Sequence, residues 1–228
     1  MNTVLEYISK KKADYAQLPL FEFMRDSNFT AKDRLSFMPY FSFFIMAFSD
    51  FNKFILRSEA PTDVYQQKVN EHTYEDDHHW PWFLEDLDKL GYNQKTTTVE
   101  CLRDLWSDET QASRKLMYQL SALVTDMSSI ERIAIIEAIE ETGNVLFGLT
   151  TPLANMIQKE TGTKLRYCGE FHFALESGHA QRQEHAELSN IRLTDDVRRR
   201  CVANVDRVFE LFEAWTHEAL SNAQRKVT

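Results

Sequence analysis

Apolar residues recur every three or four positions along most of this chain, the spacing that predicts amphipathic helices. N-cap residues and glycine stops divide the pattern into helices over residues 3–18, 31–57, 61–90, 99–107, 109–126, 130–160, 164–188 and 195–226. Pro81 either kinks the third helix or begins a new one. With only 6 glycines and 5 prolines, the chain has few turn formers. We therefore predict an all-α, single-domain bundle of seven to eight helices over residues 1–228.

The segment 31–57 is predicted to be one long core helix. It carries eight aromatic residues, and side chains of this kind are mostly buried. Its most apolar run, residues 37–52, contains Pro39 and two serines and is too short for a membrane span. The segment is therefore expected to belong to a protein core and not to a membrane.

Charge and cysteine usage narrow the range of partners. The formal net charge of −9 disfavours nucleic acid and anionic membranes, because both bind basic patches. The three cysteines, Cys101, Cys168 and Cys201, form no CxxC pair, which favours reduced thiols over a disulfide framework. The first residues contain no apolar run of signal-peptide type, so a cytoplasmic protein is expected, as a monomer or a homodimer.

The strongest chemical signal lies in residues 167–188, which contain His172, Glu176 and His179. Each residue of a helix turns by about 100°, so these three side chains fall within a sector of roughly 60°. Side chains that bind one metal ion must point the same way. In isolation, however, the same spacing also fits a solvated charged face.

A second cluster, residues 71–79, has more candidate ligands than one site needs. If the helix is continuous through Pro81, its apolar side favours the set His72, Glu75, Asp76 and His79 as inward ligands. If Pro81 breaks the helix, the inward set becomes Glu71, Glu75 and His78. The acidic residues of this run could also serve only to interact favourably with the dipole at a helix N-terminus.

A carboxylate on the strongly apolar helix 130–147 completes the pattern. Glu140 is its most inward acid and Glu137 is the second choice. An unpaired buried carboxylate is costly, and a metal ion or an arginine such as Arg132 or Arg166 would compensate its charge. Two helices with histidines and acids, and a glutamate between them, supply about the six ligands of a dinuclear iron site.

This arrangement resembles the haem-oxygenase-like diiron oxidases, a family that includes the chlamydial death-domain-associating protein and the bacterial fatty-acid decarboxylases that form terminal alkenes. The family's last ligand helix carries a histidine, three residues, an acid, two residues and a histidine. His172, Glu176 and His179 match this order, with Glu where Asp is common. Glu140, or Glu137, matches a glutamate on the preceding long helix.

The first ligand helix of the family also has a counterpart, since residues 75–79 run into an apolar segment that ends in Leu-Gly. The family often has an acid seven residues before its histidine. His72 stands there if His79 is the ligand, and Glu71 stands there if His78 is the ligand.

The resemblance implies two irons, O2 as co-substrate, and oxidation of a small organic acid, amino acid or amine. It also implies a substrate pocket beside the metals, for which we expect the aromatic run 37–52 to supply Phe41, Phe44 and Met46.

Three other functions are compatible with the sequence. A thiaminase-like enzyme would be free of metal and would use Cys168 as its nucleophile. A ferritin-like site would use the Glu75-x-x-His78 and Glu176-x-x-His179 pairs. A non-catalytic helical module would hold zinc, or no metal, in the same clusters.

Overall fold

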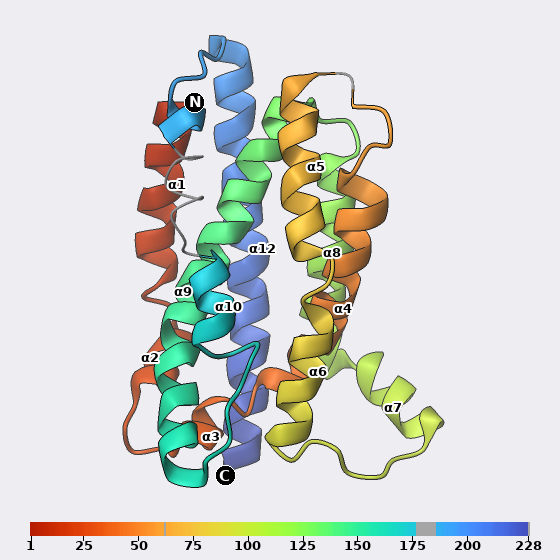
Figure 1. Cartoon of the computed structure of the whole chain (residues 1–228), viewed down its shortest axis with the longest axis vertical. Helices are drawn as coiled ribbons and strands as arrows, with labels where there is room; N and C mark the ends of the chain where they lie inside the picture. The colour runs from red at the N-terminus through yellow and green to blue at the C-terminus, as the bar shows by residue number, and fades with distance from the viewer. Residues whose placement is uncertain (62, 177–185, 228) are drawn as a thin grey trace.

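The computed structural model describes residues 1–61, 63–176 and 186–227, and its regular structure is helical throughout this part (Figure 1). The predicted all-α bundle is therefore confirmed. None of the described helices has the length and apolar character needed to cross a membrane. In chain order the helical elements are α1 (Asn2–Tyr15), α2 (Pro19–Arg25), α3 (Ala31–Arg34), η1 (Met38–Phe41), α4 (Ser42–Asp50), η2 (Phe51–Leu56), α5 (Val64–Asp76), α6 (Trp80–Lys89), α7 (Thr98–Leu105), η3 (Asp108–Thr110), α8 (Gln111–Val124), α9 (Ser129–Thr161), α10 (Glu170–Glu176) and α12 (Asp195–Val227).

Two helices of 33 residues each, α9 and α12, form the centre of the bundle. They pack against each other along the long axis, with α1 on one side and α4, α5 and α8 on the other (Figure 1). The short helix α10 lies across α9. Residues from α5, α9 and α10 can therefore meet inside the bundle.

The limits of α9 follow from local chemistry that the sequence predicted. Ser128 and Glu131 form a capping box, in which each side chain bonds the backbone N–H of the other residue. At the other end Gly162 adopts φ 76°, a left-handed conformation that glycine reaches without a steric penalty. Both ends of the central helix are thus fixed by a few local residues.

The prediction of one long helix over residues 31–57 was wrong. The segment is divided into α3, the 3₁₀ turn η1, α4 and the π-helical turn η2. Pro39 lies inside η1 and has no backbone N–H, so a regular hydrogen-bond ladder cannot pass through it. The segment still belongs to the core, because Phe37, Phe41, Phe44 and Phe51 are buried.

Two further helix boundaries differ from the predictions. The chain leaves the helix between Asp76 and Trp80, so that Pro81 lies in the first turn of a separate helix, α6. The helix predicted from residue 164 begins only at Glu170. Residues 177–185, the predicted continuation of this helix, lie outside the described part of the chain.

Arg57 fixes the break between α5 and α6. Its guanidinium donates to the backbone carbonyl of Thr73 (2.8 Å) and to the carboxylate of Asp77 (2.5 Å). Ser49 donates a further hydrogen bond to the Asp77 carbonyl. These bonds satisfy carbonyl groups that a helix end leaves without partners. The turn at residues 77–79 is thereby held against α4 and η2.

The Glu131 carboxylate links the start of α9 to α12. Burial alone would raise its pKa, but hydrogen bonds from Arg200 and Ser128 outweigh burial and lower the pKa. The ionised form thus stabilises the fold above pH ~4.5, and this stability is lost as the pH falls through the lower pKa of the folded state. We predict that Glu131→Gln reduces the free energy of unfolding by about 1 kcal/mol at pH 7 and by less at pH 3.5.

Urea unfolding at the two pH values measures this difference. Glu160→Gln, an exposed substitution in the same helix, serves as the control. An effect of Glu131→Gln that is equal at both pH values would contradict the assigned role of the charge.

Candidate metal centre

Five of the predicted metal ligands meet in the interior of the bundle. His72 and Asp76 come from α5, His79 from the turn before α6, Glu140 from α9 and His172 from α10. Their side chains are less than one-fifth exposed, and His172 is only 2% exposed. This set of five residues is called the His/carboxylate cluster below.

Three members of the cluster converge on one point. The Nε2 atom of His72 lies 3.1 Å from an Asp76 oxygen and 3.5 Å from a Glu140 oxygen. One donor atom from each residue lies within 4.8 Å of the other two. His72 and Asp76 are four residues apart in α5 and share its buried side with Val69 and Thr73.

The other two members are joined by an imidazole pair. His172 Nε2 lies 3.0 Å from His79 Nδ1, and His172 Nδ1 lies 3.0 Å from the Tyr167 carbonyl oxygen. A carbonyl can only accept, so the proton of His172 is assigned to Nδ1 and the lone pair to Nε2. Metal-binding histidines show this pattern, in which the second ring nitrogen donates to a carbonyl or carboxylate.

The remaining sequence candidates of α5 and the following turn do not join the cluster. Glu71, Glu75 and His78 are exposed, and His78 contacts Asp77 at 3.3 Å instead. The inward set is therefore His72, Asp76 and His79, even though the helix breaks before Pro81. The prediction of this set assumed a helix that continues through Pro81, and that assumption was wrong. His79 points inward because Arg57 holds the turn in which it lies.

On α9 the structure separates the two predicted glutamates. Glu140 lies in the His/carboxylate cluster, whereas Glu137 lines a different hollow, between α9 and α1. Two other predicted ligands, Glu176 and His179, are not placed: the Glu176 side chain and the whole of His179 lie outside the described part of the chain.

The electrostatics of the cluster centre on Asp76. Burial disfavours its charged form, but the neighbouring imidazoles, above all that of His72, outweigh this effect and lower the pKa of Asp76. Asp76 therefore stays ionised in the interior. A buried anion beside a second carboxylate requires nearby positive charge.

The geometry of the cluster fits a metal ion. Two donors that lie about 2.1 Å from one ion are separated by at most about 4.2 Å. The separations of 3.1 and 3.5 Å around His72 Nε2 fall within that limit. Imidazole and carboxylate donors together suit iron, manganese or zinc. The three donors of His72, Asp76 and Glu140 can thus hold one ion.

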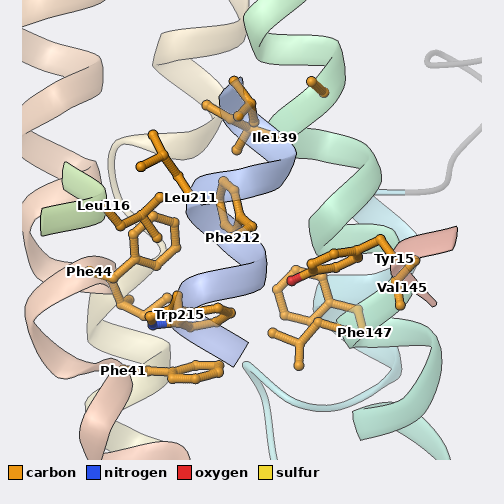
Figure 2. Close-up of a cluster of buried hydrophobic side chains, with 14 of the residues drawn as sticks. Tyr15, Phe41, Phe44, Leu116, Ile139, Val145, Phe147, Leu211, Phe212 and Trp215 are labelled. Carbon is orange, nitrogen blue, oxygen red and sulfur yellow. The ribbon is translucent and has the colours of Figure 1, made fainter. Parts of the chain in front are cut away.

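An apolar cavity of about 70 Å³ opens beside the cluster. Asp76, His79, Glu140 and His172 form one wall, and the rest of the lining is almost entirely aromatic or aliphatic. Figure 2 shows several of these side chains facing one another across the core, from α1, α4, α9 and α12. Of the three residues expected from the segment 37–52, Phe44 lines the cavity, whereas Phe41 packs on Trp215 and Met46 is exposed, so neither of these two lines it.

Asp86 is a buried carboxylate that the sequence analysis did not select. Its two oxygens accept hydrogen bonds from the backbone N–H groups of Arg166 (2.6 Å) and Cys168 (2.8 Å). Burial raises its pKa in spite of these bonds. Through them α6 holds the segment that leads into α10, and so positions Tyr167 and His172. Its position three residues after Phe83, on the apolar side of α6, was the available signal.

Cys168 does not have the properties of a nucleophile. It is 1% exposed, and burial together with the nearby Asp86 carboxylate raises the pKa of its thiol well above the ordinary value. A reactive cysteine needs a lowered pKa and access to its substrate. The structure therefore gives no support to a thiaminase-like mechanism.

We predict that Asp86→Asn lowers the free energy of unfolding by about 1–3 kcal/mol, because an amide can accept only one of the two N–H bonds through oxygen. Urea unfolding at neutral pH measures the effect. Asp88→Asn, at an exposed position of the same helix, is the matched control and should change stability little. Equal stability of the two variants would show that Asp86 does not hold the 166–168 segment.

Comparison with known proteins does not assign the chain to a family. No family model matches the chain, and no curated protein matches it either. What the centre can do is therefore inferred from its own residues.

Proposed function

We propose that this protein is a non-haem diiron oxidase that activates O2 and oxidises a small organic molecule. The observation that supports this proposal is that three imidazoles and two carboxylates lie together in the protein interior, next to an apolar cavity. A purely structural ion-pair network would not need a cavity beside it. Carboxylate-rich sites of this kind inside helical bundles are typical of dinuclear iron.

The residues of the chain have distinct roles in this proposal. Asp76 and Glu140 supply negative charge to balance the cations, and His72 lies between them. The Tyr167 carbonyl orients His172, and Trp82 stacks on the ring of His79 with centroids 4.5 Å apart. Bound iron would supply the electrons that reduce O2. The aromatic wall of the cavity would keep water away from the reacting groups.

A zinc-binding helical module is the alternative that remains. It would use the same donors but would not react with O2. The open cavity favours the oxidase, because structural zinc sites are closed by four protein ligands. Metal content and O2 reactivity separate the two functions.

We expect anaerobic protein to bind about two ferrous ions per chain and to give a transient visible absorption band when mixed with O2. Iron analysis and stopped-flow absorbance measure these properties. The variant Asp76→Asn should lose most of the bound iron, while His217→Ala, a surface histidine next to Glu213, should retain it. Wild-type protein that binds zinc but no iron, or iron that is inert to O2, would refute the oxidase.

The neighbouring histidines of the turn provide a second test. We predict that His79→Ala reduces the rate at which O2 oxidises the bound ferrous iron by more than about 100-fold, because the substitution removes a metal donor and the partner of His172. His78→Ala should change this rate by less than about twofold, since the His78 side chain is 58% exposed. The reverse order would transfer the role to Glu71, Glu75 and His78.

The sequence also assigns His179 to the centre, and a third substitution tests that residue. We predict that His179→Ala removes bound iron and activity, because the described residues supply five donors and a dinuclear centre needs about six. If this variant bound as much iron as the wild type, the donors beyond the five described ones would have to come from residues other than His179.

A further inference from the structure

Few polar groups outside the His/carboxylate cluster line the cavity, and one of them is the hydroxyl of Tyr15. Tyr15 is the last residue of α1 and is 4% exposed. Its ring packs edge-on against Phe21 and Phe209, with centroids 5.0 and 5.8 Å apart. Figure 2 shows its oxygen pointing across the core toward Phe212 and Trp215.

No residue in the described part of the chain forms a hydrogen bond with this hydroxyl, and burial alone raises its pKa. Tyr15 therefore presents a protonated O–H to the cavity. A buried hydroxyl without a partner costs free energy, and most native proteins avoid this arrangement. An unpaired O–H that faces a cavity indicates that a bound ligand supplies its hydrogen-bond partner.

Water is a poor candidate for that group. A buried water normally makes two to four hydrogen bonds, but most side chains that line the cavity are apolar, among them Phe44, Phe212 and Ile139. The space of about 70 Å³ has room for on the order of five water-sized groups. These dimensions fit a small organic molecule.

The charge of the lining limits the class of molecule further. No lysine or arginine is among the described residues that line the cavity, so away from the His/carboxylate cluster a carboxylate or phosphate on the ligand would find no cationic side chain. The two acids of the lining, Asp76 and Glu140, face the imidazoles. Uncharged groups of the lining, such as the Tyr15 hydroxyl and the Trp215 indole N–H, remain to recognise a polar group away from the cluster.

We propose that the cavity binds an uncharged, largely apolar small molecule, aromatic or short-chain aliphatic, whose single hydrogen-bonding group pairs with Tyr15 Oη. This molecule is the substrate if the proposed oxidase function holds. The proposal therefore favours neutral alcohols, phenols and amides over amino acids and other charged compounds.

Isothermal titration of metal-free protein and of anaerobic ferrous protein with p-cresol, toluene, 4-methylbenzoate and 4-methylbenzylamine tests the proposal. We expect p-cresol to bind about three- to tenfold more tightly than toluene, the gain of one hydrogen bond. 4-Methylbenzoate should bind at least about tenfold more weakly than p-cresol to the metal-free protein, and 4-methylbenzylamine at least about tenfold more weakly than p-cresol to the ferrous protein.

Two variants locate the binding site. Tyr15→Phe should abolish the preference for p-cresol over toluene while leaving toluene affinity unchanged, and Tyr118→Phe is the control for the same change at an exposed tyrosine. Gly143→Leu should weaken both probes at least tenfold, because Gly143 lines the cavity and a Cβ there meets only Phe147 ring atoms, at 3.6 Å or more. Circular dichroism confirms that each variant is folded.

Two outcomes would overturn the proposal: p-cresol selectivity that persists in Tyr15→Phe, or a charged probe that binds more tightly than p-cresol, for 4-methylbenzoate in the metal-free protein and for 4-methylbenzylamine in the ferrous protein. Iron content is measured on the same samples. Loss of iron binding with intact p-cresol selectivity would refute the oxidase but not the pocket. Normal iron and O2 reactivity without p-cresol selectivity would refute the pocket but not the oxidase.

Discussion

Two carboxylates buried in the middle of an aromatic core impose the main constraint on this fold. Asp76 and Glu140 approach the same histidine, and their charges would be costly in an apolar interior without compensation. The imidazoles of α5, α10 and the turn before α6 surround them. The bundle therefore has to bring three separate helical regions to one point, and its long central helices α9 and α12 provide the rigid frame for this.

Contacts outside the cluster hold its members in place. Arg57 ties down the end of α5, Asp86 binds the backbone before α10, and the Tyr167 carbonyl holds the ring of His172. The first two contacts join segments that are distant in sequence, and the third is local to the start of α10. The donor atoms are thus oriented before any ligand arrives, which lowers the cost of binding.

The amino-acid pattern predicts the helices better than it predicts their interruptions. Caps at Ser128 and Thr194 and stops at Gly91 and Gly162 are local signals, and the helices begin or end there. The division of segment 31–57 depends on how several short pieces pack, which local periodicity does not encode. His72 and Asp76 were selected from the apolar side of a helix assumed to continue through Pro81, and they lie inward although that helix breaks. Asp86 was missed because its partners lie 80 and 82 residues further along the chain.

The position of α10 has a consequence for how a bound ion would affect stability. His172 lies 100 residues after His72 (172 minus 72) and follows the whole of α9 in the chain. An unfolded chain brings donors so far apart in sequence together only at the entropic cost of closing a long loop. An ion that requires all these donors would therefore bind the folded bundle in preference to the unfolded chain, and would stabilise the fold by that difference in binding.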